Sequence, residues 1–275
     1  MGNTQKVITE KQDLRHLKWA HGRSSSGITG TFLKSQEIIN DEKIYYKLSN
    51  FDSEKGIIGH ECVNEIIVDR LLEILGVEHL TYQLIHADVE IEDKVYDTWI
   101  CASKDFKMRG ETKTALDNYY QVNRLGNESH YEFCEQKGWK KYIDTMIAVD
   151  YLILNRDRHG ANIEVLKNSR KHSIRIAPLF DNGLSLLCSC YTEDEIDKFD
   201  IFKDRPCQNF IGSRSSYDNL NLIDDKSSIL AGKLKIQDKE TLFRDLDNVL
   251  SRMHMDKIWE MLWSRWCEYE KLCNL

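Results

Sequence analysis

The hydrophobic pattern of the chain changes near residue 104, and this change limits the folds that the sequence can adopt. Before it, apolar and polar side chains alternate as in strands, with one helix expected at 61–76. After it, helical spacing dominates, apart from two short strands expected on either side of Pro178. We therefore expect an α+β fold with a small β-rich lobe that contains one helix, residues 1–104, and a larger, mainly helical lobe, residues 105–275.

Helical periodicity in the second lobe is strongest in three segments, 131–155, 241–253 and 255–272. The Trp and Met residues of the last two segments recur at helical spacing, which is more typical of a core-facing stripe than of a cofactor site. In the first lobe, Gly76 stands where the C-terminal cap of the 61–76 helix is expected.

The composition argues against several classes of protein. The formal net charge is −7, and direct nucleic-acid binding is not expected because phosphate backbones are bound by clustered Lys and Arg. No apolar run approaches the roughly 18 residues that a membrane span needs. The N-terminus lacks a secretory signal, so we expect a cytoplasmic protein. The eight cysteines are scattered and are expected to be reduced thiols.

The segment NRDRHGANIEVL, residues 155–166, concentrates polar side chains between an expected buried helix and a strand. Such a corner is either a surface turn or a site. Phosphoryl transfer needs a carboxylate that orients or deprotonates the attacking hydroxyl, and oxygen ligands for magnesium. Asp157 and Asn162 can supply both, at the spacing that protein kinases use for these two roles. His159 is a candidate catalytic residue or a structural histidine of the loop.

A second polar motif, FDNG, follows the two expected strands and would return to the same cleft. Asp181 is the candidate magnesium carboxylate, and Gly183 is expected to let the backbone turn sharply after it. Either motif alone is typical of a turn. In this order, the two together indicate a metal-dependent phosphoryl-transfer site that binds ATP and Mg²⁺ through Asn162 and Asp181.

The first lobe should then supply a strand lysine for the phosphates and a helix glutamate that holds it. Lys47 lies mid-strand by alternation, and its alternative role is a solvated surface lysine. Glu65 is the expected partner, with Glu61 one turn earlier as the competitor, because both lie on one face of the helix.

The segment HGRSSSGITG is interpreted as the loop that covers the phosphates. Gly27 and Gly30 would free the backbone there, and the hydroxyl groups of Ser24, Ser25 and Ser26 would add donors. A flexible linker is the alternative interpretation.

The chain resembles the HipA-like serine/threonine kinases in DYLILNRDRHGANIEVL, APLFDNGLSLL and HECVNEIIVDRLLEILGV, over roughly residues 20–225. The resemblance implies a two-lobed protein-kinase-like fold. It also implies that Asp157 is the catalytic base, that Asn162 and Asp181 bind magnesium, and that Lys47 contacts ATP. An Asn-Glu pair of the family has its counterpart in Asn64 and Glu65.

The resemblance also bears on the acceptor and on partners. Family members can autophosphorylate a serine of the phosphate loop, which makes Ser24 to Ser26 candidate sites. The acceptor is expected to be a protein serine or threonine. HipA toxins carry an additional N-terminal subdomain that this chain is expected to lack, so toxin activity and an antitoxin-like partner stay open. The DRH and DNGL motifs also resemble phosphoinositide kinases, so a lipid or small-molecule acceptor and a nucleotide-binding pseudokinase are the alternatives.

Overall fold

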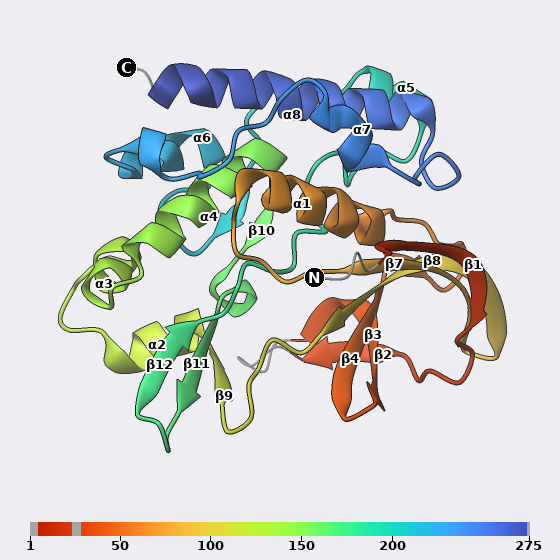
Figure 1. Ribbon diagram of the computed structural model, residues 1–275, viewed down its shortest axis with the longest axis horizontal. Coiled ribbons are helices and arrows are strands. Elements are labelled where there is room, and N and C mark those ends of the chain that lie inside the picture. Colours follow the sequence, from red (N-terminus) through yellow and green to blue (C-terminus); the bar gives the residue numbers. More distant parts are fainter. Residues whose placement is uncertain (1–4, 24–28, 274–275) are drawn as a thin grey trace.

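The computed structural model describes residues 5–23 and 29–273, and its first lobe is built on a six-stranded sheet (Figure 1). The strand order is β1-β7-β8-β4-β3-β2, in which only the β1–β7 pair of this sheet is parallel. The strands are β1 (Val7–Asp13), β2 (Ala20–Arg23), β3 (Thr29–Ile39), β4 (Glu42–Leu48), β7 (Gln83–Ile91) and β8 (Lys94–Lys104). A small hairpin, β5 (Phe51–Asp52) with β6 (Gly56–Ile57), precedes the helix.

Two tight turns fix the register of this sheet. Asn40 and Asp41 join β3 to β4 with φ values of 50° and 63°, and Glu92 and Asp93 join β7 to β8 with φ values of 51° and 63°. Two successive residues at positive φ match the twist of an antiparallel pair. In β4 the resulting register places Lys47 opposite Lys34 of β3 and Cys101 of β8.

Helix α1 (Glu61–Leu75) is the expected helix of the first lobe, and nearly every one of its residues is buried. It ends at Gly76, whose φ of 68° allows the N–H groups of Gly76 and Val77 to bond the carbonyls of Glu73 and Leu72. The predicted cap is therefore confirmed. Figure 1 shows α1 between the sheet and the helices of the second lobe.

The second lobe contains the remaining helices and two small sheets, ordered β12-β11-β9 and β10-β13. Its strands are β9 (Thr112–Ala115), β10 (Asp157–Arg158), β11 (Glu164–Asn168), β12 (Ser173–Ile176) and β13 (Gln208–Asn209). Its α-helices are α2 (Leu116–Asn123), α3 (His130–Gln136), α4 (Lys140–Ile153), α5 (Glu193–Asp197), α6 (Ser216–Asn219), α7 (Asp238–Phe243) and α8 (Arg252–Cys273). Three single-turn helices are η1 (Gly160–Asn162), η2 (Leu220–Leu222) and η3 (Lys226–Ser228).

Three expectations about this lobe need correction. The helix expected at 131–155 is divided into α3 and α4 at Gly138, whose φ of 77° is left-handed. The helix expected at 241–253 is interrupted after α7, because Asp245 has a φ of 62° and α8 begins only at Arg252. The two strands β11 and β12 both precede Pro178, and the segment after it pairs only through a bridge between His79 and Leu179.

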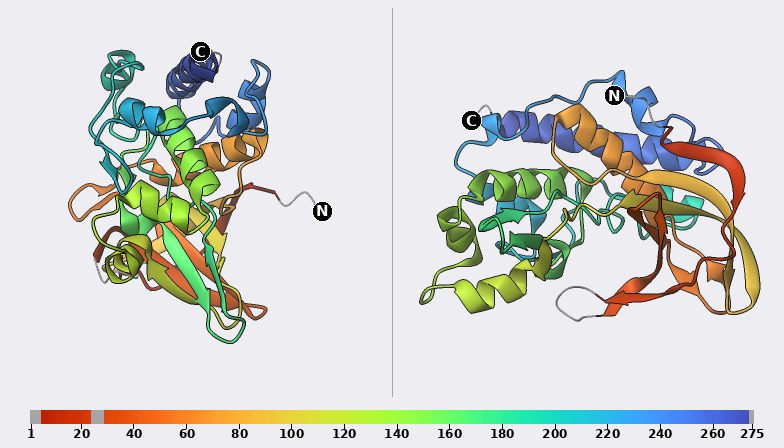
Figure 2. Two further views of the ribbon diagram at one scale, coloured as in Figure 1. Left: turned by 90° about the vertical axis from the view of Figure 1, so that its left-hand side faces the viewer. Right: turned by 60° about the horizontal axis from the view of Figure 1, so that its bottom comes forward.

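The hydrophobic core connects the lobes. The larger buried cluster includes α1, α4 and α8, and a smaller cluster covers the other face of the six-stranded sheet. Helix α8 runs over α4 (Figure 2) and also contacts α5. Its Met261 and Trp266 are buried core residues as predicted, whereas Met253 of the same predicted stripe is 43% exposed. None of the helices among the described residues is both long and apolar enough to cross a membrane.

Candidate active site

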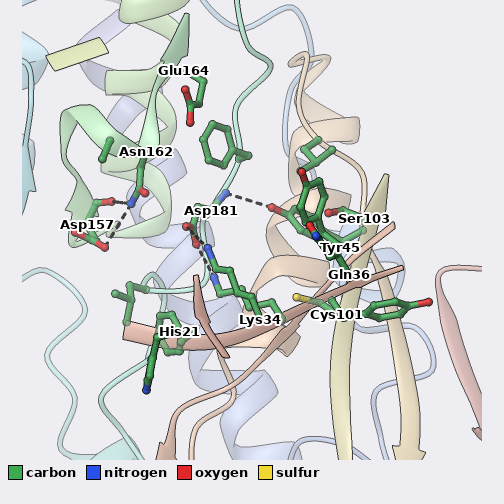
Figure 3. Close-up of a pocket in the computed structure, with 18 of the residues that line it drawn as sticks. His21, Lys34, Gln36, Tyr45, Cys101, Ser103, Asp157, Asn162, Glu164 and Asp181 are labelled. Atoms are coloured by element: carbon green, nitrogen blue, oxygen red, sulfur yellow. Dashed lines mark hydrogen bonds and ion pairs between the residues drawn. The ribbon is translucent and has the colours of Figure 1, made fainter. Parts of the chain in front are cut away.

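A cleft of about 1590 Å³ is lined by residues of both lobes. Strands β3, β4 and β8 form one wall, and the segments around β10 and Asp181 form the other. Figure 3 shows Asp157 and Asn162 side by side on one wall, with Asp181 between them and Lys34. The two polar motifs of the second lobe and the lysine strand of the first therefore face one cavity.

Lys47 is the centre of a buried ion-pair network that crosses this cleft. Its Nζ lies 3.1 Å from Glu65 Oε1 and 2.5 Å from Asp181 Oδ1, and the residue is only 8% exposed. Lys34 Nζ approaches the other oxygen of Asp181 at 3.8 Å. Asp181 thus contacts two ammonium groups that leave neighbouring positions of the sheet. The glutamate that pairs with Lys47 is Glu65, whereas Glu61 accepts a hydrogen bond from Asn50 N at 3.0 Å.

Helix α1 also holds the backbone that follows Asp181. The two oxygens of Glu65 accept hydrogen bonds from the N–H groups of Asn182 at 2.9 Å and Gly183 at 3.1 Å. Asn64 Nδ2 donates to the carbonyls of Gly183 and Ser185 at 3.0 and 3.1 Å. Glu65 therefore holds both Lys47 and the segment that follows Asp181.

The expectation that Gly183 lets the backbone turn sharply is wrong. The left-handed residue of this segment is Asp181, with a φ of 58°, and Gly183 is not left-handed. A Cβ on Gly183 would lie 3.1 Å from both the Cβ and the carbonyl oxygen of Glu61. Glycine is favoured here because α1 packs tightly against this backbone.

The loop from Asp157 to Asn162 is closed by its own side chains. Asn162 Nδ2 donates to Asp157 O at 2.8 Å and lies 3.4 Å from Asp157 Oδ2. His159 Nδ1 accepts from Ala161 N at 3.2 Å. In the neutral ring, Nε2 must then carry the proton, and it lies 3.5 Å from Asp157 Oδ1. His159 thus positions the Asp157 carboxylate.

The buried Arg158 side chain links the Asp157 loop to the Asp181 segment. It is 1% exposed, and its guanidinium pairs with Asp150 of α4 at 2.9 Å. The same group donates to the carbonyl of Phe180 at 2.7 Å and to Asn182 Oδ1 at 2.6 Å. One buried side chain therefore holds the Phe180 backbone and the Asn182 side chain, on either side of Asp181, relative to the Asp157 loop.

The pKa values of Asp157 and Asp181 are shifted in opposite directions from the ordinary value of an aspartate. Burial is the largest influence on Asp157 and raises the pKa of its carboxyl above the ordinary value, although His159 opposes the rise. Burial also penalises charge on Lys47 and Asp181, but their mutual attraction outweighs it. The pKa of Lys47 lies well above its ordinary value, and that of Asp181 lies well below. One carboxyl is thus suited to accept a proton and the other to remain ionised.

Asn162 and Asp181 offer the hard oxygen ligands that magnesium takes. The Asn162 amide is oriented by the bonds from its Nδ2, so that Oδ1 is the atom left to meet a cation. No cluster of three or more His, Cys, Asp or Glu side chains suited to a metal occurs within residues 5–23 and 29–273. The donor set therefore fits a cation that shares its coordination with substrate phosphates.

The expected phosphate loop is only partly described. The strand β2 ends at Arg23, and Gly30 lies near the start of β3, which pairs with it. Ser24, Ser25, Ser26 and Gly27 lie outside the described residues.

Comparison with known proteins gives the fold. No protein-family model and no curated protein matches the sequence. The Helicobacter pylori proinflammatory kinase CtkA matches with a TM-score of 0.63 and 18% identity, over 95% of this chain and 98% of that one. A chain from the complex of HipA, HipB and operator DNA of Shewanella oneidensis MR-1 matches with a TM-score of 0.50 and 12% identity, over 94% of this chain and 68% of that one. The chain has the HipA-like kinase fold. The expected two-lobed, kinase-like α+β fold is confirmed.

Two contributors to this candidate site could not be fully located from the sequence. Lys34 was not singled out, although a lysine in the strand before Lys47 could have been placed opposite it by the β3–β4 hairpin register. The structural role of Arg158 had no local signal, because its partners Phe180 and Asn182 lie 22 and 24 positions away in the chain.

Proposed function

We propose that the protein is an ATP- and magnesium-dependent kinase that transfers the γ-phosphoryl group to a serine or threonine of a protein. One observation carries the proposal. A single cleft of a HipA-like kinase fold is lined by Lys47, held by Glu65 and Asp181, and by Asp157 with its neighbour Asn162. These are the side chains that phosphoryl transfer requires, and they come from β4, α1, the 157–162 loop and the Asp181 segment.

Asp157 is the candidate catalytic base. Its raised pKa improves its ability to take the proton of an acceptor hydroxyl. As the O–H bond breaks, the acceptor oxygen bonds to the γ-phosphorus, and the bond from that phosphorus to the β–γ bridging oxygen breaks to leave ADP. His159 keeps the carboxylate oriented through its contact at 3.5 Å.

Lys47 supplies positive charge for the phosphates, and Glu65 fixes the position of its ammonium group. Asn162 and Asp181 would hold magnesium, which would supply positive charge to neutralise the charge that develops during transfer. Of the two, Asp181 is kept ionised at neutral pH by the nearby lysines, which suits a cation ligand.

Autophosphorylation in the phosphate loop is part of the proposal. The strands that flank this loop, β2 and β3, are hydrogen-bonded neighbours at the edge of the sheet that carries Lys47. The loop between them holds Ser24, Ser25 and Ser26. The described parts of both flanking strands line the cleft, with Ala20 and His21 of β2 and Phe32 and Lys34 of β3, and this supports the proposal that an intervening serine is an acceptor.

The test is intact-mass spectrometry of the purified chain after incubation with ATP and magnesium, with and without a generic protein substrate. We expect a gain of about 80 daltons per phosphoryl group. Asp157→Ala and Asp181→Ala should each abolish the gain without unfolding the protein, and Asp181→Ala should also weaken magnesium-dependent ATP binding. Asp247→Ala is the matched control, because Asp247 is exposed and does not line the cleft.

Three outcomes separate the alternatives. Peptide mapping to a serine or threonine supports the protein kinase, and mapping within Ser24 to Ser26 identifies self-modification. ATP consumption without labelled protein would redirect the proposal to a lipid or small-molecule acceptor. Magnesium-dependent ATP binding without any consumption would identify a pseudokinase, and retained transfer by the Asp157→Ala variant would remove Asp157 from the catalytic role.

A further inference from the structure

The cleft contains two arginines that the phosphoryl-transfer chemistry does not use. Arg156 precedes the candidate base directly, and Arg214 lies in the loop after β13; both line the cleft. Arg156 is half-buried and Arg214 is exposed. Among the described residues, neither side chain has an ion-pair or hydrogen-bond partner, and this holds also for the exposed Lys18 of the same cleft, whereas the lysines at positions 34, 47, 104 and 113 face carboxylates.

Backbone hydrogen bonds bring these two arginines together beside the candidate base. Strand β13 pairs with β10 so that Gln208 is opposite Asp157, and Gln208 N donates to Arg156 O at 2.9 Å. The residue before Gln208, Cys207, donates from its N–H to Arg214 O at 2.9 Å. Arg156 and Arg214 therefore flank a single short strand next to Asp157.

The position of Arg214 is fixed by the turn that carries it. Ser215 and Ser216 both donate hydrogen bonds from their hydroxyls to Asp204, and the Ser215 side chain caps α6. The serines of this segment are thus engaged in a turn, and Asp204 is occupied by them. No described carboxylate forms an ion pair with Arg214.

Unpaired guanidinium groups in a chain of net charge −7 favour an anionic ligand at this position. The cleft volume of about 1590 Å³ exceeds the roughly 300 to 1,000 Å³ of a typical small-molecule pocket. It therefore has room for a nucleotide and a second substrate. Pro206 and Gln208, which also line it, are exposed, so that this end is open enough for a polypeptide segment.

We propose that Arg156 and Arg214 select an acceptor peptide in which an acidic or phosphorylated residue flanks the serine or threonine that is modified. The guanidinium groups bind the carboxylate or phosphate, and the hydroxyl of the neighbouring residue is thereby brought to Asp157. This inference rests on the proposed kinase function and names its substrate class.

The experiment uses a positional peptide library with a central serine or threonine and one flanking position fixed at a time as Asp, Glu, phosphoserine, Gln or Lys. Transfer of labelled phosphoryl from ATP is measured for the full chain and for Arg156→Gln, Arg214→Gln and Arg214→Glu. Arg205→Gln is the matched control, because Arg205 stacks on Phe199 at 4.1 Å and does not line the cleft. Thermal unfolding shows whether each variant folds.

We expect the unmodified enzyme to prefer an anionic residue at one or more flanking positions. The ratio of kcat/KM for anionic over Gln peptides should fall about tenfold in Arg156→Gln and about threefold in Arg214→Gln, since the second arginine is exposed. Arg214→Glu should shift the preference toward Lys. The Asp, Glu and phosphoserine arms show which anionic group is preferred.

Equal losses for anionic and neutral peptides would overturn the inference, because the arginines would then serve ATP or the fold. Transfer to peptides without an anionic preference would overturn it while leaving the kinase proposal intact. Absence of transfer to every peptide and to the chain itself would contradict both.

Discussion

Replacing Arg158 by methionine should separate the stability of the fold from the positioning of the site. The guanidinium is the only cationic partner of the Asp150 carboxylate among the described residues, and Asp150 is 2% exposed. Without Arg158, Asp150 keeps the hydrogen bond from Asn155 Nδ2 at 2.9 Å. Breaking one side of a buried ion pair costs about 3 to 5 kcal/mol, and for a domain of this size the melting temperature should fall by roughly 10 °C.

The double variant Arg158→Met, Asp150→Asn should recover stability without recovering activity. Neutralising Asp150 removes the unpaired buried charge, so the free energy of unfolding should return to within about 2 kcal/mol of the unmodified chain. Activity should not return, because Phe180 O and Asn182 Oδ1 still lack the donor that fixes Asp181. A misplacement of about 1 Å costs on the order of 100-fold in rate.

Urea unfolding followed by circular dichroism gives the stability, and ATP-dependent phosphoryl transfer gives the activity. Arg265→Met is the matched control: this buried arginine donates only to Tyr151 O, Ile201 O and the Ser216 hydroxyl, away from the cleft. A cost below about 1 kcal/mol for Arg158→Met would refute the ion-pair argument. Recovery of transfer in the double variant would refute the positioning argument.

Two further predictions concern pH. His159→Gln removes a group that lowers the pKa of Asp157, so the acidic limb of the kcat/KM profile should move to higher pH; an unchanged limb would dissociate His159 from the base. His60 and His254, whose rings lie 4.5 Å apart, both have their pKa lowered by burial to about 4. Because the unfolded chain binds these protons more readily, the free energy of unfolding should fall as pH drops from about 6.5 toward 4, by about 1.4 kcal/mol per pKa unit for each histidine. Urea midpoints across this range should change less for His254→Gln, and equal slopes would exclude these histidines.

The parts of the site that could be predicted from sequence are those whose geometry is local. Asp157 and Asn162 lie within one loop, and their spacing alone brings the side chains together. Lys47 could be placed by strand alternation, and helix periodicity narrowed its partner to Glu65 or Glu61 on one helix face. These features follow from spacing within a single loop, strand or helix, so they can be predicted from the sequence.

Features that depend on packing between distant segments could not be predicted in the same way. The sequence suggested a turn at the glycine that follows Asp181 by two positions, yet the feature of Gly183 that matters is the close approach of Glu61 from α1. The choice between Glu61 and Glu65 was equally open, since both lie on one helix face. Only the distance from α1 to β4 and to the Asp181 segment decides it.

Helix α1 belongs to the first lobe by chain order but is bonded to the second. Chain order places α1 in the first lobe, but Asn64 and Glu65 make four hydrogen bonds to the segment that follows Asp181. The helix also shares the larger apolar core with α4 and α8. The helix is bonded to the sheet as well, because Cys62 donates from its N–H to Ser49 Oγ at 3.0 Å and from its Sγ to Lys47 O at 3.1 Å. Lys47 and Asp181 therefore meet beside a helix that is hydrogen-bonded to the segments carrying both of them.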